Sequence, residues 1–273
     1  YAALDLLNHT RPQCASDNTL VLMGEEQANL NTGDCAVLTN RFDLAEQIKA
    51  NKKPVAFSDF ALADAQSLLP QPTQVVMRLD KEKALAHHQF NLAAQLLCAN
   101  PGGQLWLVGH KNEGLKTYLK KLAKLIKGEH IVHKGKEGYQ CIQIKVDSID
   151  LDQPLDDSQY GELRTIATTP MALLSKPGQY GHKKIDAGSK LLIERVLQDY
   201  KSAPDHRFLD LGCGYGYLAC MASSLAYEEI IATDNNAASV ASAQANFDAL
   251  GINGTVVATD CAKGLEGRFN LVL

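Results

Sequence analysis

The sequence predicts an α/β protein of two tandem domains, each built on a largely parallel sheet. Short apolar segments of strand length alternate with longer helical patterns in both halves of the chain, as expected for strands joined by right-handed crossovers. In the second half, three successive apolar segments end in an aspartate. This pattern places three carboxylates at the edge where open α/β sheets bind ligands. The 273 residues suffice for two domains that each bury a core.

Composition narrows the class of protein further. The net charge of −4 provides no overall basic field, so any nucleic-acid site has to be a local patch. The seven cysteines are odd in number and form no C-x-x-C pair, which indicates reduced thiols in the cytoplasm rather than disulfides or zinc. No apolar run approaches the roughly 18 residues of a membrane span, and no signal peptide is visible. Because the chain opens on Tyr1 rather than Met, we expect further residues before it.

The first half alternates apolar segments with helical patterns in a regular order. Strands are expected at residues 19–23, 35–39, 54–57, 74–78 and 103–109. Helices are expected at residues 42–50, 85–99 and 115–127, with a short amphipathic helix at 2–8. A hairpin around Gly138, within residues 129–146, closes this domain.

The first domain lacks an obvious ligand loop. Its first strand is followed by Gly24-Glu-Glu-Gln, with one glycine where the second half has three. Two glutamates at this place repel a carboxylate rather than cradle it. We therefore interpret residues 1–146 as a degenerate duplicate of the fold of the second half. An unrelated α/β domain is the alternative, because this topology recurs widely.

Residues 147–163 are expected to be an acidic linker between the first domain and a second at residues 164–273. The linker contains Pro154 and, up to Glu162, no Lys or Arg, and its like charges keep it solvated. Its six acids are Asp147, Asp150, Asp152, Asp156, Asp157 and Glu162. Beyond it, we expect a strand and turn at 171–181 and a helix at 189–200.

The second domain is organised around residues 208–217, which read F-L-D-L-G-C-G-Y-G-Y. An apolar strand ends in Asp210, and a glycine turn leads into a helix expected at 218–225. Its three glycines are Gly212, Gly214 and Gly216. Glycines let the backbone approach a ligand closely, and the start of a helix favours an anion such as a carboxylate. The spacing is G-x-G-x-G, whereas a dinucleotide-binding fold requires a third glycine at the position of Tyr217.

Two further strands, at residues 228–234 and 255–260, also end in an acid. Asp234 follows Gly214 by twenty residues, the separation at which a carboxylate meets a bound ribose diol in a β-α-β unit. Asp260 is suited to an adenine amino group. Three unrelated aspartates that cap helices are the alternative, but motif, spacing and strand context agree on a nucleoside cofactor.

The glycine turn behind an acidic strand end resembles motif I of the class I S-adenosylmethionine-dependent methyltransferases, whose domains are Rossmann-like. Over nearly its whole length the chain resembles the ribosomal RNA guanine-N2 methyltransferases. The small-subunit methyltransferase C type is the most similar, and the large-subunit enzyme is next. The segments that carry the resemblance are Pro177–Tyr180, Ile185–Leu192, the glycine turn and Gly267–Leu273. Proteins of this family have two tandem methyltransferase-like domains, the first without cofactor.

The resemblance implies methyl transfer from S-adenosylmethionine to the exocyclic N2 amine of a guanine in ribosomal RNA, most closely that of the small ribosomal subunit. A monomer is expected, with no membrane association and no metal. The matching cofactor residues are Asp186, Gly188 and Ser189 at the methionine end, Asp210 and the glycine turn at the amino-acid group, Asp234 with Asn235 at the ribose, and Asp260 with Cys261 at the adenine.

In the resembling family, the strand that corresponds to residues 269–273 runs into Asn-Pro-Pro-Phe, which clamps the target amine. The sequence stops at Leu273, so the second domain is expected to be truncated, and the catalytic residues are expected just after Leu273. A non-catalytic module that keeps the cofactor pocket and binds RNA or protein is the alternative to an enzyme. Motif I also leaves open a small molecule or a protein glutamine as methyl acceptor.

The helix expected at 115–127 is the best candidate for phosphate contacts. Leucines and an isoleucine at helical spacing would face the core and leave the lysines outward, which is equally typical of an ordinary solvated face. The candidate RNA contacts are Lys116, Lys120, Lys124 and Lys127.

Three other signals are weaker. The spacing of His130, His133 and Cys141 does not support a metal site. Tyr180 and Tyr217 could stack on a flipped base, although single aromatics more often belong to packing.

Overall fold

The computed structural model describes residues 18–24, 32–201 and 204–273. The chain divides into two compact units between Gln159 and Tyr160, and each unit is considered by itself. The helix expected at 2–8 lies outside the described residues, and so do the two glutamates that follow Gly24.

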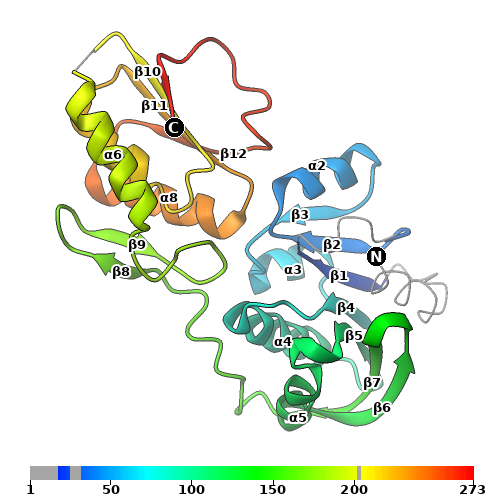
Figure 1. Ribbon diagram of the computed structural model, residues 1–273. Coiled ribbons are helices and arrows are strands. Elements are labelled where there is room, and N and C mark those ends of the chain that lie inside the picture. Colours follow the sequence, from blue (N-terminus) through cyan, green and yellow to red (C-terminus); the bar gives the residue numbers. More distant parts are fainter. Residues whose placement is uncertain (1–17, 25–31, 202–203) are drawn as a thin grey trace. The chain divides into compact units, whose positions relative to one another are not determined.

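One seven-stranded sheet forms the centre of the first unit, in the order β3-β2-β1-β4-β5-β7-β6 (Figure 1). The strands are β1 (Thr19–Met23), β2 (Ala36–Thr39), β3 (Val55–Phe57), β4 (Gln74–Arg78), β5 (Gln104–His110), β6 (Ile126–Lys134) and β7 (Tyr139–Ile149). Strands β1 to β5 pair in parallel, and β7 is antiparallel to both β5 and β6. The order reverses between β1 and β4, which is where open α/β sheets bind ligands.

The helices of the first unit follow the expected crossovers. They are α2 (Phe42–Ala50), α3 (Leu62–Leu68), α4 (Lys83–Leu97) and α5 (Leu115–Leu125), with 3-10 turns η2 (Lys111–Glu113) and η3 (Lys136–Gly138). On α5, Leu115 and Leu122 are buried, while Lys116, Lys120 and Lys124 are exposed. The helix ends at Leu125, so Lys127 lies on β6, where it is also exposed. Helix α3 was not predicted from the sequence, because it is only seven residues long and offers less than two full turns of apolar spacing.

Part of the acidic segment after β7 is hydrogen-bonded to α4, so it does not form a free linker there. The Asn91 side chain donates to the Leu155 carbonyl and accepts from the Leu155 amide, both at 2.8 Å. His88 Nδ1 lies 3.1 Å from an Asp157 carboxylate oxygen. Asp156 and Asp157 thus have basic partners on α4, Asp156 with Lys83 at 3.8 Å and Asp157 with His88. Asp147, Asp152 and Glu162 are exposed.

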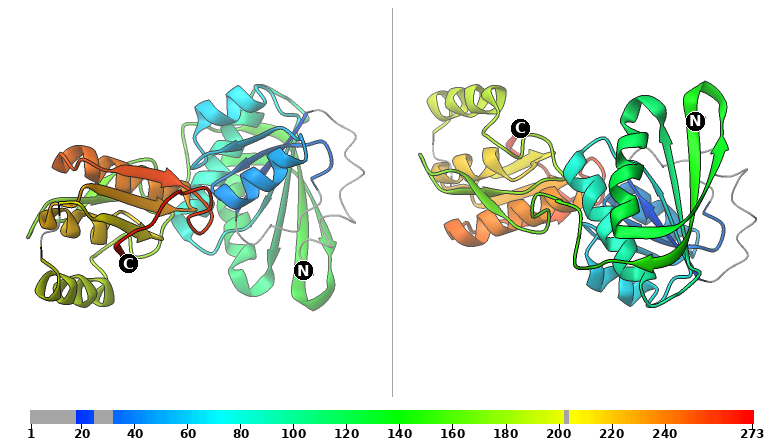
Figure 2. Two further views of the ribbon diagram at one scale, coloured as in Figure 1. Left: turned by 90° about the horizontal axis from the view of Figure 1, so that it is seen from above. Right: turned by 90° about the horizontal axis from the view of Figure 1, so that it is seen from below.

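The second unit contains a four-stranded parallel sheet and a separate two-stranded antiparallel ribbon. Its strands are β8 (Arg164–Ala167), β9 (Leu173–Ser175), β10 (Arg207–Leu211), β11 (Glu229–Asp234), β12 (Thr255–Ala258) and β13 (Leu271–Val272). Its helices are α6 (Ala187–Asp199), α7 (Tyr217–Ala222) and α8 (Ala237–Leu250), with η4 (Ser223–Leu225) after α7. Helix α7 contacts both α6 and α8. In both views of Figure 2, the yellow-green α6 and the orange α8 lie at opposite ends of this unit.

The two units share a topology. The second sheet has the order β12-β11-β10-β13, which repeats the order β3-β2-β1-β4 of the first. Each unit therefore contains four parallel strands in the same order, and its sheet reverses between the first and the fourth of these strands. This shared strand order is what a duplicated α/β fold would give, and the duplication itself stays a prediction.

Two features of the second unit differ from expectation. Strand β12 ends at Ala258 rather than Asp260, and a tight turn follows in which the Lys263 amide donates to the Asp260 carbonyl at 2.9 Å. Helix α8 was not anticipated, since its Ala- and Ser-rich sequence has little apolar periodicity. Its start was nevertheless readable, because Asn236 is a favourable N-cap residue. No helix among the described residues is long and apolar enough to cross a membrane.

Candidate functional site

The glycine turn after β10 is left-handed at all three glycines. The φ values are 76° at Gly212, 56° at Gly214 and 81° at Gly216, which L-residues with a side chain rarely adopt. A Cβ at Gly216 would meet Ala243 Cβ of α8 at 3.2 Å, whereas one at Gly212 or Gly214 would meet nothing within 4 Å. The third glycine thus serves helix packing, and the first two keep a backbone surface open for a ligand.

Asp210 lies beneath this turn and is almost fully buried. It is 1% exposed, and its carboxylate accepts a hydrogen bond from the Ala219 amide of α7 at 2.9 Å. Burial raises the pKa of Asp210 to about 7; the Ala219 hydrogen bond opposes this rise and the nearby charge of Asp234 adds to it. The side chain therefore joins strand to helix, and its carboxyl group titrates near neutral pH.

Asp234 closes the turn from the neighbouring strand. One carboxylate oxygen accepts from the Gly214 amide at 2.9 Å, and the other accepts from the Asn236 amide at 2.8 Å. A carboxylate has about four lone-pair positions, so two remain for a ligand. Asn236 in turn caps α8 by accepting from the amides of Ala238 and Ser239 at 2.8 and 3.2 Å. Sequence reasoning missed Asn236, although it holds the position next to Asn235.

Asp186 reaches the same turn from the start of α6. Its carboxylate accepts from the Ser189 amide at 2.9 Å and from the Ser189 hydroxyl at 3.2 Å. The Ser189 amide is the main reason that the pKa of Asp186 is lowered. The backbone of Asp186 also hydrogen-bonds Tyr215, whose pKa burial raises to about 12. At Gly188, a Cβ would lie 3.0 Å from an Asp186 carboxylate oxygen, so a side chain there would press on this cap.

A buried asparagine of α8 ties the β9 segment to the glycine turn. Asn246 is fully buried and donates to the carbonyls of Leu174 at 2.8 Å and Tyr215 at 2.7 Å. Its side-chain oxygen accepts from the Leu174 amide at 2.7 Å. No sequence motif indicated this residue, because a polar side chain in a helix is read as solvent-facing until the packing is known.

Asp260 and Cys261 lie on the turn beyond β12 and are exposed. The Asp260 carbonyl accepts from the Lys263 amide at 2.9 Å, and Cys261 has a left-handed φ of 48°. The Thr259 amide bonds the Asp234 carbonyl, so this turn starts beside the end of β11. The sequence-predicted cofactor residues thus converge at one edge of the second sheet, whereas the lysines of α5 belong to the first unit. Cys261 is among six described cysteines that are all free thiols.

The strand registers identify what the first unit has in place of the three carboxylates. Leu22 pairs with Leu38 as Asp210 pairs with Ala232, so Leu22 occupies the position of Asp210. By the same register, Asn40 stands where the second unit has Asp234. Counting from the pairing of β3 with β2, Phe60 takes the place of Asp260 and is fully buried. The first unit therefore has the same strand order as the second, but it has no carboxylate at these three positions.

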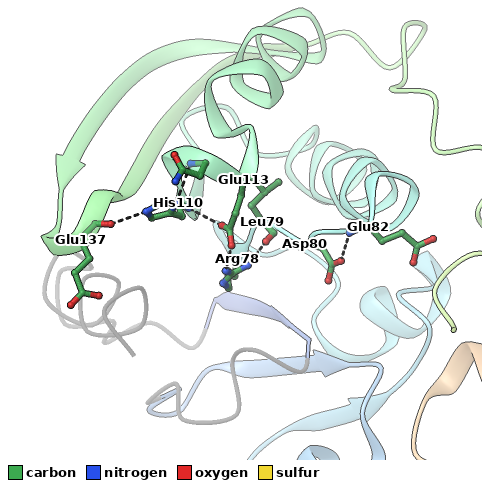
Figure 3. Close-up of polar contacts among 8 residues, drawn as sticks. Arg78, Leu79, Asp80, Glu82, His110, Glu113 and Glu137 are labelled. Atoms are coloured by element: carbon green, nitrogen blue, oxygen red, sulfur yellow. Dashed lines mark hydrogen bonds and ion pairs between the residues drawn. The ribbon is translucent and has the colours of Figure 1, made fainter.

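The reversal point of the first unit is occupied by its own side chains (Figure 3). Arg78, at the end of β4, donates to the Leu79 carbonyl and to the Glu113 carboxylate, each at 2.5 Å. The second Glu113 oxygen accepts from the His110 amide at 2.8 Å. In the described part of this unit, a largely buried ion pair thus lies at the position that corresponds to the candidate cofactor site of the second unit.

No group of three or more His, Cys, Asp or Glu side chains among the described residues is arranged to hold a metal ion. The strand order, the glycine turn and the acid at the end of the second strand define a class I methyltransferase fold. Residues 170–273 match the family model of the methyltransferase small domain, and residues 6–133 match that of its N-terminal domain. The chain belongs to the methyltransferase small domain family, which confirms the resemblance noted in the sequence.

Curated relatives of known type are similar over much of the chain. The ribosomal RNA small subunit methyltransferase C of Pseudomonas putida (strain W619) is 27% identical over 244 residues, or 89% of this chain and 66% of the relative. The protein of the same name from Pseudomonas paraeruginosa is 30% identical over 199 residues, or 70% of this chain and 54% of the relative. The chain thus spans less than two thirds of the length of either relative.

One solved structure agrees with the fold across the whole chain. It is the Thermus thermophilus 16S rRNA N2 G1207 methyltransferase RsmC, in complex with AdoMet and guanosine. The TM-score is 0.76 at 20% identity, over 99% of this chain and 72% of that one. At this identity the agreement concerns the fold, and it confirms two tandem α/β units of methyltransferase type.

Proposed function

We propose that the protein is an S-adenosylmethionine-dependent methyltransferase that acts on the exocyclic N2 amine of a guanine in ribosomal RNA of the small subunit. The proposal rests on the glycine turn after β10. Its backbone is open at Gly212 and Gly214, and the Asp234 carboxylate is hydrogen-bonded to it at the carboxyl ends of the parallel strands. A ligand with a ribose and a cationic amino-acid group fits a site with an outward carboxylate and a buried acid. When bound, S-adenosylmethionine supplies an electrophilic methyl group.

The assigned residues bind and orient the cofactor. Asp234 with Asn235 would hold the ribose hydroxyls, since two lone-pair positions of the carboxylate remain for them. Asp210 and the glycine turn would receive the charged amino-acid group, and Asp260 with Cys261 would lie against the adenine. Asp186, Gly188 and Ser189 would bound the methionine end, which their link to Tyr215 supports.

The acceptor is proposed from the relatives, whose names specify small-subunit ribosomal RNA. The Leu273 carbonyl accepts from the Leu211 amide at 2.8 Å, so Leu273 stands at the sheet edge next to Gly212. We propose that the amine clamp of the family belongs at this edge. A clamp helps because the lone pair of an exocyclic amine is delocalised and has to be oriented toward the methyl group.

The first unit is proposed to contact RNA rather than cofactor. Lys116, Lys120, Lys124 and Lys127 are all exposed, which suits contacts with phosphates. The replacement of the three acids by Leu22, Asn40 and Phe60 supports one cofactor per chain. We further propose that the protein acts in the cytoplasm as a monomer without a metal.

Two measurements on the full chain test this function. Calorimetry with S-adenosylhomocysteine should show one site per chain, and a chain that does not bind it would overturn the proposal. Tritiated methyl transfer should then label the RNA of undermodified small subunits, and nuclease digestion should release the label as N2-methylguanosine. Label in large-subunit RNA alone would favour the large-subunit activity, and cofactor binding without transfer to any RNA would favour a non-catalytic module.

A further inference from the structure

Tyr180 is the most exposed of the large apolar and aromatic side chains in the part of the chain that the structure describes. It is 89% exposed, compared with 69% for Leu191, the next among the large apolar and aromatic residues. Tyr217, the other candidate aromatic, is 5% exposed and belongs to the core of the second unit. A ring this exposed packs little against the rest of the unit, so it is accessible to an external partner.

The backbone that presents Tyr180 is firmly anchored. Residues 175–179 are all buried, and the Gln179 side-chain amide donates to the Ser242 hydroxyl of α8 at 2.6 Å. Lys176 Nζ lies 4.4 Å from the centre of the buried Tyr160 ring. Gly178 passes so close to this ring that a Cβ would lie 2.1 Å from the Tyr160 hydroxyl. The anchor lowers the entropy cost of using Tyr180 for binding.

The residues after Tyr180 give this segment a positive charge. It continues as Gly181-His182-Lys183-Lys184, and both lysines are exposed. Residues 175–190 include four lysines and one acid, in a chain whose net charge is −4. The acid is Asp186, and Lys184 is close enough to add to the lowering of its pKa, after the larger contribution of Ser189. The basic segment therefore ends at the cofactor side of the unit.

A single ring between polar or glycine neighbours does not make an apolar docking surface, since Gln179 is buried and Gly181 has no side chain. A tyrosine ring flanked by lysines suits a single nucleotide of RNA. The base can stack on the ring, and the negatively charged phosphates on either side of it can contact the lysines. We propose that Tyr180 stacks on an unpaired base of the RNA substrate while Lys183 and Lys184 contact the adjacent phosphates. The choice of RNA rests on the proposed function.

Fluorescence anisotropy with a labelled single-stranded RNA of about 16 nucleotides tests the stacking. Tyr180→Ala should weaken RNA binding roughly 5- to 150-fold, as expected for the loss of one stacked base. Tyr180→Phe should restore most of the affinity, since it keeps the ring. Tyr200→Ala is the matched control, because Tyr200 is an exposed tyrosine of the same unit, and it should leave RNA affinity unchanged.

The salt dependence of RNA affinity tests the phosphate contacts separately. Replacement of both Lys183 and Lys184 by Gln should reduce the slope of log affinity against log salt by about 0.7 for each lost contact. Calorimetry with S-adenosylhomocysteine on the same samples should give dissociation constants within about twofold of wild type. A Tyr180→Ala protein that binds this RNA as tightly as wild type overturns the stacking proposal even if the cofactor binds. A wild-type chain without cofactor binding overturns the proposed function instead, and the RNA measurements still decide the role of Tyr180.

Discussion

The Asp234 carboxylate accepts a hydrogen bond from the Gly214 amide at 2.9 Å, across twenty residues of sequence. This contact joins the end of the second strand of the unit to the middle of the glycine turn after its first strand. It also aligns the remaining lone pairs of the carboxylate beside an open backbone surface.

Replacement of Asp234 by Ala should weaken binding of S-adenosylhomocysteine at least ~10-fold. A charge-assisted hydrogen bond contributes about 1.5–3 kcal/mol, and a ribose diol offers two such bonds. Calorimetry measures the change, with Asp248→Asn as the control on the exposed side of α8. Unchanged affinity of the Asp234 variant would remove this residue from the cofactor site.

Substitutions at Gly214 and Gly216 should have different effects, one mainly on cofactor binding and the other mainly on thermal stability. Gly214→Ala and Gly216→Ala both place a side chain at positive φ, at a cost of about 1–2 kcal/mol. Only Gly216→Ala also forces a contact with Ala243 across to α8, so it should lower the thermal stability of the second unit more. Gly214→Ala should instead abolish cofactor binding with a smaller loss of stability. Differential scanning calorimetry and cofactor titration distinguish the two, and equal effects of both variants would contradict the division of roles.

Asp210 should make cofactor affinity depend on pH. Its pKa of about 7 means that the folded protein holds this proton below neutrality, and a ligand with an ammonium group favours the ionised form. Affinity for S-adenosylhomocysteine should therefore rise between about pH 5 and 7 and level off above that. The Asp210→Asn variant should show no such rise, while Asp248→Asn should behave as wild type. A wild-type affinity that is flat across this range would argue against a role for the Asp210 charge.

The same raised pKa has a consequence for stability. An unfolded aspartate has a pKa near ~3.9, so between about pH 4 and 7 the folded state binds more protons than the unfolded state. The free energy of unfolding should then fall as pH rises through this window. Asp210→Asn should reduce this fall, which thermal unfolding at pH 5 and pH 8 can measure.

Glu113 should be needed for the stability of the first unit but not for cofactor binding. Its side chain and that of Arg78 are 15% and 7% exposed, and loss of one partner of a buried ion pair costs about 3–5 kcal/mol. The single tryptophan, Trp106, is buried in the first unit, so its fluorescence during urea unfolding reports on that unit. Glu113→Gln should shift this transition to lower urea concentration.

Glu129→Gln is the matched control for Glu113. Glu129 pairs with Lys145 at 3.1 Å, but both side chains are about half exposed or more, and such pairs contribute less than about 1 kcal/mol. Equal effects of the two variants would mean that burial does not distinguish the pairs. A loss of cofactor affinity in Glu113→Gln would contradict the separation of roles between the units.

The class of fold and the candidate cofactor residues of the second unit could both be predicted from the sequence. Alternation of strands and helices, the three glycines and the spacing from Gly214 to Asp234 are local or short-range signals, and they were readable without coordinates. The family resemblance followed from the same segments. The identity of each candidate cofactor residue was therefore available from the sequence.

The tertiary structure alone decided which chemistry each position can perform. Only the strand registers show that Leu22, Asn40 and Phe60 stand in place of three carboxylates, because equivalence between two sheets depends on pairing across the chain. Only packing shows that Asp210 is buried while Tyr180 is exposed, since a residue type does not determine its burial. Hydrogen bonds between distant residues and the dielectric around each charge arise from the folded chain, and no local pattern in the sequence encodes them.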